Sequence, residues 1–207
     1  GIVTPVSRRY ELLGWASKEP SRYIIEDDYD SEFRLLGKPI PSLQSIDVMN
    51  KVIYMNTFTK SLAPTIRISY MVLPLHLLKK YQESCSFYST TVSKIQQEVL
   101  REFIRGGYFG RHLNKMRGIY KNKHDFLVGE LKKKNWVENI AGDNAGLHVL
   151  VQVNTTLTEE EICKKAAECG IRLMGIREHY IHTPPEGRPV LLLGYGKPDE
   201  QEIQKGL

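Results

Sequence analysis

The sequence predicts an α/β protein built from a larger βα-type part and a smaller α+β part. Between residues 23 and 84, apolar runs of strand length alternate with amphipathic runs of helical length, as in a sheet flanked by helices. A long helical pattern follows at about 111–134. From about 137 the pattern changes to strand-like alternation with one further helix. We expect a domain boundary inside the long helix, which divides the chain into 1–115 and 116–207.

Length and composition fit an ordinary folded protein, because 41% of the 207 residues are hydrophobic. No apolar run approaches the roughly 18 residues of a membrane span, so no membrane partner is expected. The three cysteines, Cys85, Cys163 and Cys169, have no metal-like spacing and indicate free thiols in the reducing cytoplasm. The net charge of +5 permits contact with nucleic acid or acidic partners without requiring it.

The first half of the chain carries one helix, three strands and a second helix. Thr4 can cap the first helix, because Pro5 suits the first helical position, and Glu19-Pro20 ends it. Its apolar face comprises Val6, Tyr10, Leu13 and Trp15. The strands are expected at 23–26, 52–57 and 66–73, and the second helix at 75–84.

Helices dominate the middle of the chain. An amphipathic helix at 92–105 is stopped by Gly106-Gly107, and the long helix follows it. The long helix has a basic face, made of Arg111, Lys115, Arg117, Lys121, Lys123 and Lys132–Lys134. This face could contact nucleic acid, but no aromatic or glycine pattern of an RNA- or DNA-binding module accompanies it. We therefore favour a solvated helix face.

The last part predicts three strands around one helix, followed by the start of a last helix at 198–203 that stops at Leu207. A strand is expected at 146–153, and Thr158 with Glu161 forms a capping box that opens a helix ending at Gly170. Two further strands are expected at 171–175 and 189–195.

Lys60 stands between two strand-like runs, in the segment Met55–Arg67. A lysine that is partly desolvated there is a nucleophilic amine able to form a Schiff base. Thr57, Thr59 and Arg67 would offer hydroxyl groups and a forked cation to a phosphate. The plain alternative is an ordinary Lys60 on a turn between strands.

An acidic cluster, Glu26-Asp27-Asp28, ends the strand upstream of the lysine and is followed by Tyr29. Ligands of α/β sheets collect at the carboxyl ends of strands. A carboxylate there can pair with a protonated ring nitrogen, and the tyrosine can reach a ring hydroxyl. With the Schiff-base lysine and the phosphate donors, this set describes pyridoxal 5'-phosphate (PLP) chemistry.

Two stretches carry a resemblance to a known family. IIEDDYDSEF, at 24–33, and YMNTFTKSLAPTIRISYMVLP, at 54–74, resemble the aminotransferase-like domain of MocR-type regulators, a branch of the GntR transcription factors. The GABA-responsive members are the most similar. The resemblance implies a fold-type-I, class I aminotransferase-like PLP domain, present as part of the large domain plus a small C-terminal α+β domain. It also implies a homodimer, and DNA contact through a winged helix-turn-helix outside this chain.

The resemblance assigns a role to each residue of the cofactor set. Lys60 corresponds to the internal-aldimine lysine, Asp27 to the partner of the PLP ring nitrogen, and Tyr29 to the residue facing the ring hydroxyl. The phosphate contacts correspond to Thr57, Thr59 and Arg67. Asp28 is the rival of Asp27, since side chains of adjacent strand residues point to opposite faces and only one can serve.

The arginine that grips the carboxylate of a substrate or effector corresponds to Arg177, and Arg188 is the alternative. A bidentate fork explains arginine at such a place. His148, His179 and His182 complete no catalytic or metal-ligating set, so no metal is expected.

Two functions share all these residues. One is a PLP-dependent sensor that binds an amino-acid-type effector as external aldimine within a transcription regulator. The other is an aminotransferase acting on an amino acid. Arg67 lies seven residues after Lys60, as in MocR-like proteins, whereas class I aminotransferases place it one later and prefer Gly or Ser where Thr57 stands. We therefore favour the regulator. Both ends of the chain look cut, so the phosphate-cradling glycine-rich loop and the ring-stacking aromatic are expected before residue 1, and an inactive fragment is a third possibility.

Overall fold

The computed structural model describes residues 4–34, 40–142, 146–183 and 186–207, and these divide into two compact units. We call the first the lysine unit; it contains the described residues of 4–32 and 37–116. The second, the C-terminal unit, contains those of 117–207 together with Phe33 and Arg34. No helix among the described residues combines the length and the apolar character needed to cross a membrane.

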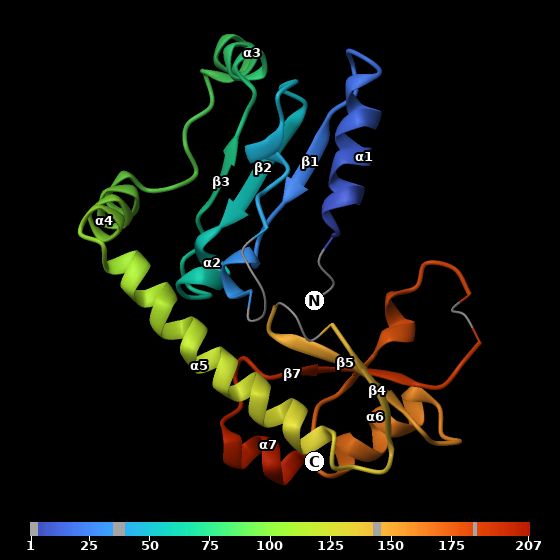
Figure 1. Ribbon diagram of the computed structural model, residues 1–207. Helices are drawn as coiled ribbons and strands as arrows, with labels where there is room; N and C mark the ends of the chain where they lie inside the picture. The colour runs from blue at the N-terminus through green and yellow to red at the C-terminus, as the bar shows by residue number, and fades with distance from the viewer. Residues whose placement is uncertain (1–3, 35–39, 143–145, 184–185) are drawn as a thin grey trace. The chain divides into compact units, whose positions relative to one another are not determined.

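The lysine unit is built on a three-stranded sheet, ordered β1-β2-β3 (Figure 1). Strand β1 (Ile24–Asp27) runs parallel to β2 (Val52–Thr57), and β3 (Ser69–Val72) is antiparallel to β2. The predicted strands are therefore present, although the last is shorter than expected. The helical elements are α1 (Val6–Ser17), η1 (Ser31–Phe33), η2 (Gln44–Ile46), α2 (Phe58–Ser61), α3 (Leu75–Cys85) and α4 (Lys94–Arg105).

Helix α1 differs from the prediction in its cap and in its buried face. The N-cap residue is Pro5 rather than Thr4, and no side chain caps the helix. Val6, Tyr10 and Trp15 are each about half exposed (50%, 59% and 49%), and Ala16 is the buried residue of the helix. Helix α1 lies alongside β1 (Figure 1), and its buried residue is the small Ala16 rather than one of the larger apolar side chains of the predicted face.

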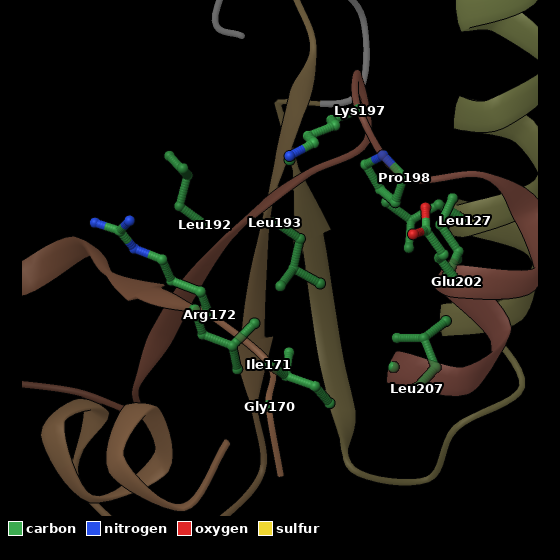
Figure 2. Close-up of a pocket in the computed structure, with 14 residues that line it drawn as sticks. Leu127, Gly170, Ile171, Arg172, Leu192, Leu193, Lys197, Pro198, Glu202 and Leu207 are labelled. Carbon is green, nitrogen blue, oxygen red and sulfur yellow. The ribbon is translucent and has the colours of Figure 1, made fainter. Parts of the chain in front are cut away.

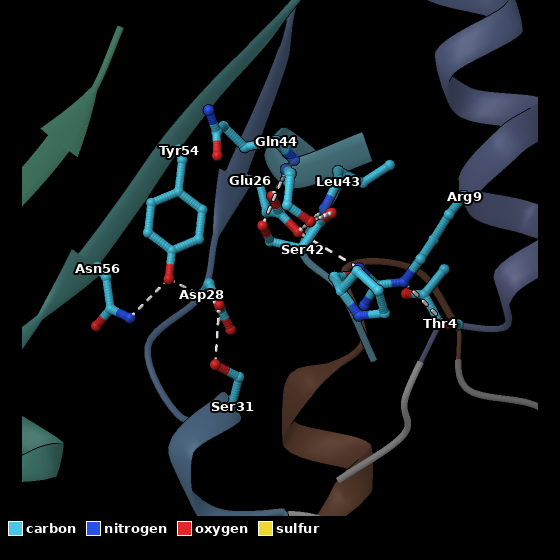
Figure 3. Close-up of polar contacts among 12 residues, drawn as sticks. Thr4, Arg9, Glu26, Asp28, Ser31, Ser42, Leu43, Gln44, Tyr54 and Asn56 are labelled. Atoms are coloured by element: carbon cyan, nitrogen blue, oxygen red, sulfur yellow. Dashed lines mark hydrogen bonds and ion pairs between the residues drawn. The ribbon is translucent and has the colours of Figure 1, made fainter. Parts of the chain in front are cut away.

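The side chain of Glu26 links β1 to η2 and to helix α1. Its carboxylate accepts hydrogen bonds from the backbone N–H groups of Leu43 (2.7 Å) and Gln44 (3.0 Å), just before and within η2. Arg9 of α1 lies 3.5 Å from the same carboxylate (Figure 3). A charged acceptor forms stronger hydrogen bonds than a neutral one. Glu26 thus fixes the residue that precedes the predicted site residue Asp27.

Helix α5 (Tyr108–Leu131) runs from the lysine unit into the C-terminal unit, beginning and ending three residues earlier than predicted. The C-terminal unit then forms a four-stranded antiparallel sheet, ordered β4-β5-β7-β6. Its further elements are β4 (Val137–Ala141), β5 (His148–Val153), α6 (Glu159–Glu168), β6 (Met174–Gly175), η3 (Ile176–His179), β7 (Val190–Gly194) and α7 (Glu200–Gly206).

The core of the C-terminal unit lies between this sheet and the helices that cover it (Figure 1). Val149, Val151 and Val153 alternate along β5 and are buried, which is the period of two expected for a strand with one core face. Leu131, at the end of α5, is fully buried against them. Tyr195 is also buried and satisfies its hydroxyl by donating to the carbonyl of Gly146 at 2.5 Å.

Candidate functional site

Lys60 lies on the short helix α2, which begins where β2 ends. Thr57 is the last residue of β2 and the N-cap of α2, and its Oγ1 accepts a hydrogen bond from the backbone N–H of Thr59 at 3.2 Å. The cap turns the chain sharply from strand to helix. The side chain of Lys60 is exposed, so the structure does not show the partial desolvation that the sequence led us to expect.

The two threonines predicted to bind phosphate are side by side. Their Oγ1 atoms are 2.9 Å apart, and each also lies within hydrogen-bonding distance of a carbonyl on the segment that returns toward β3: Ile68 for Thr57 (3.1 Å) and Ile66 for Thr59 (2.9 Å). A threonine hydroxyl has a single proton, so each would have to turn away from its carbonyl to donate to a phosphate. Arg67 lies between the two carbonyl residues and is exposed.

Strand register separates the two candidate aspartates. Asp27 is in register with Met55 on β2, both are exposed, and Thr57 lies two residues further on the same face. Asp28 lies on the opposite face, since its carboxylate accepts a hydrogen bond from the Tyr54 hydroxyl at 2.9 Å. The structure therefore places Asp27 on the face of Thr57, at the carboxyl ends of two parallel strands.

Asp28 belongs to a polar network instead (Figure 3). Its Oδ2 accepts from Ser31 and Tyr54, each at 2.9 Å, and the Tyr54 hydroxyl accepts in turn from the Asn56 amide at 2.9 Å. Burial raises the pKa of Tyr54 well above its ordinary value, which keeps this phenol a donor to the carboxylate. Sequence reasoning missed the network because its members come from two segments, 28–31 and 54–56, that are far apart in the sequence.

Tyr29 is 42% exposed, just after β1. Its pKa is raised, first by the negative charge of Asp30, then by burial and by Asp27. A raised pKa keeps the phenol protonated, so its hydroxyl remains a hydrogen-bond donor. That Tyr29 faces a cofactor ring hydroxyl stays a prediction.

Glu32 offers a pH-dependent test of the network. Its carboxylate accepts from Asn56 at 3.2 Å, and burial, the largest cause, raises its pKa above the ordinary 4.5. The folded state therefore holds the proton more tightly than the unfolded chain, so this contribution to stability is complete below pH 4.5 and is lost as pH rises through the raised pKa. We therefore expect the free energy of unfolding of Glu32→Gln to increase relative to that of the wild type as pH rises above 4.5. Urea unfolding at several pH values measures this; a difference that is constant with pH would contradict it.

Arg177 and Arg188 line one pocket of about 200 Å³ in the C-terminal unit, together with Tyr180. Arg177 is on η3, with its Nε 3.8 Å from Glu159 and its Nη2 donating to the carbonyl of Gly187 at 3.2 Å. Arg188 precedes β7, with its Nε 3.3 Å from Glu138. Both side chains are about half exposed, at 42% and 46%. The two arginines left open by the sequence are thus neighbours around one small pocket.

A different, larger cavity of about 470 Å³ lies in the same unit (Figure 2). Its lining includes apolar side chains of α5, β7 and α7, among them Leu127, Leu193 and Ile203. No residue predicted for the site reaches it. Likewise, the described residues contain no group of three or more side chains able to hold a metal ion.

Comparison with known proteins shows the family to which the chain belongs. Residues 32–190 match the family described as aminotransferase class I and II. Among solved structures, a multiple substrate aminotransferase from Thermococcus profundus is similar, with a TM-score of 0.84 and 25% identity over 99% of this chain and 50% of its own. The predicted α/β, fold-type-I class is confirmed.

Curated relatives carry the resemblance further. The chain is 41% identical to the uncharacterized HTH-type transcriptional regulator YdeL of Bacillus subtilis and 32% identical to the probable rhizopine catabolism regulatory protein MocR of Rhizobium meliloti. Each match covers all of this chain but only 44% and 42% of the relative. The predicted resemblance to MocR-type regulators is confirmed by these relatives, and the chain belongs to the aminotransferase class I and II family.

Proposed function

We propose that this chain is the PLP-binding, effector-sensing part of a cytoplasmic, homodimeric transcription regulator of the MocR type. The observation that supports the proposal is that Asp27 ends β1, Thr57 ends the neighbouring parallel strand β2, and Lys60 follows on α2. DNA contact belongs, in this proposal, to a winged helix-turn-helix outside the chain, as the names of its HTH-type relatives suggest.

The donor set fits PLP, which supplies an aldehyde for amines and an electron-withdrawing ring. Lys60 offers an exposed primary amine, and Asp27 an exposed carboxylate for the ring nitrogen. Tyr29 offers a protonated phenol for the ring hydroxyl. Thr57, Thr59 and Arg67 offer two hydroxyl groups and a guanidinium for the phosphate.

The pocket with two arginines supports an effector that carries a carboxylate as well as an amine. The amine would engage the cofactor, while a guanidinium binds the carboxylate through two parallel hydrogen bonds. A γ-amino acid is the effector class that we expect. Arg177 remains our first choice for this contact and Arg188 the alternative.

Substitution of each arginine tests the effector contact. In full-length protein, Arg177→Ala should weaken effector binding about ten- to hundredfold, because a hydrogen bond to a charged group is worth roughly 1.5–3 kcal/mol. Cofactor binding should stay unchanged. Titration of both Arg177→Ala and Arg188→Ala, followed by cofactor absorbance, measures this. An unchanged effector affinity in Arg177→Ala with a loss in Arg188→Ala would transfer the role to Arg188.

A free-standing aminotransferase is the second candidate, favoured by the similarity to the Thermococcus profundus enzyme. It would use the same lysine as a general base. Sustained release of an oxo acid by the full-length protein, at many turnovers per subunit, would support the enzyme over the sensor.

A further inference from the structure

Glu159 is a buried carboxylate at the start of α6, with its side chain 6% exposed. An acidic residue in the first turn of a helix is favoured by the helix dipole. The capping of α6 is nevertheless complete without it, because Thr158 and Glu161 form the capping box. The burial of Glu159 therefore needs another explanation.

Both oxygens of Glu159 bind groups from other elements. Oε2 accepts from the backbone N–H of Arg177 at 2.8 Å, and Oε1 accepts from that of Val190 at 2.9 Å. The Arg177 guanidinium lies 3.8 Å from Oε1. One carboxylate thus joins the start of α6 to η3 and to the first residue of β7. These donors compensate for its burial, which is costly without partners.

The fold makes room for this carboxylate at Gly175. A Cβ atom on Gly175 would lie 2.8 Å from the Cβ of Glu159 and closer still to its Oε2, nearer than such atoms approach in proteins. Glycine at the end of β6 therefore lets the carboxylate reach the N–H of Arg177, two residues later.

These contacts restrain the backbone at Arg177 and on either side of Arg188. Glu159 binds the backbone of Arg177 directly, and it binds Val190, two residues after Arg188. The guanidinium of Arg177 also donates to Gly187, which immediately precedes Arg188. All of these residues line the pocket of about 200 Å³.

We propose that Glu159 is a positioning residue that holds Arg177 and the Gly187–Val190 segment in the geometry that selects ligands with a carboxylate. The inference rests on the proposed function, in which this pocket receives the carboxylate of an amino-acid-type effector. A glutamine at this position keeps one acceptor oxygen but presents an amide N–H₂ to one of the two backbone donors, so the clamp would open on one side.

The test uses full-length protein loaded with PLP and a series of straight-chain ω-amino acids from glycine to 6-aminohexanoate. Each acid is compared with the primary amine that remains when its carboxylate is removed. The affinity for the acid divided by the affinity for its amine, both read from cofactor absorbance, reports carboxylate recognition alone. Glu159→Gln should lower this ratio about tenfold or more. Affinity for the amines and the cofactor spectrum should be unchanged, and Glu159→Asp should restore part of the ratio.

Glu160→Gln is the matched control, since Glu160 is the adjacent acid of the same helical turn and is exposed; it should leave the ratio unchanged. If the wild type prefers the acids and Glu159→Gln keeps that preference, the role of Glu159 is overturned and the proposed function stands. If Glu159→Gln weakens acids and amines equally, the residue is only structural. If the wild type binds acids and amines alike, the proposed function fails, and this inference with it.

Discussion

Lys60→Ala in the full-length protein should abolish the covalent cofactor adduct that borohydride reduction traps. Only a primary amine in the cofactor site can form the Schiff base with the aldehyde, and alanine offers none. Lys60 is exposed on α2, three residues after the Thr57 cap, so its removal should leave the fold intact. The wild type should absorb in the near-UV to visible range and the variant should lose that band.

Mass spectrometry of the reduced, digested protein locates the adduct. Lys79→Ala is a suitable control, because Lys79 is also exposed and lies on α3, outside the proposed site; it should keep the adduct. An adduct that persists on another lysine after Lys60→Ala would show that Lys60 is misassigned.

Asp27→Ala should weaken cofactor binding by roughly 1.5–3 kcal/mol, the usual worth of a hydrogen bond to a charged group, which is about tenfold or more in affinity. The reason is register: Asp27 shares the face of Met55 and Thr57, where we propose that the cofactor binds. The dissociation constant for PLP and the position of its absorbance band measure the effect.

Asp28→Ala serves as the contrasting variant. It should leave PLP affinity nearly unchanged but lower the free energy of unfolding by roughly 1–3 kcal/mol, because the hydroxyls of Ser31 and Tyr54 lose their acceptor. The opposite pattern, with PLP affinity sensitive to Asp28 and not to Asp27, would reverse the two roles.

The sequence predicted regular elements well and irregular ones poorly. β4 was missed because its pairing with β5 shifts register between Val137 and Asn139, which breaks the alternation that marks a strand. β6 was predicted at 171–175 but comprises only Met174–Gly175, because the N–H of Ile171 is used to close the end of α6, donating to Ala166. The first difference arises from an irregular strand pairing and the second from a helix end, and no local pattern encodes either.

The site shows the same division. Motifs located Lys60 and the acidic cluster, but the choice between Asp27 and Asp28 needed strand register, which places them on opposite faces. Glu159 was hidden in Thr158-Glu159-Glu160-Glu161, where it resembled one more acid of a helix start. One signal was available in the sequence: a capping box needs only the first and last of these residues, so the acids between them are free for another role.

The response of DNA binding to the effector tests the central claim most directly. Affinity of the full-length protein for the intergenic DNA beside its own gene would be measured with and without a γ-amino acid, for wild type and Lys60→Ala. The account predicts that the amino acid changes the affinity of the wild type and leaves that of Lys60→Ala unchanged. An equal response in both proteins, or no response in a wild type that steadily releases oxo acid, would contradict it.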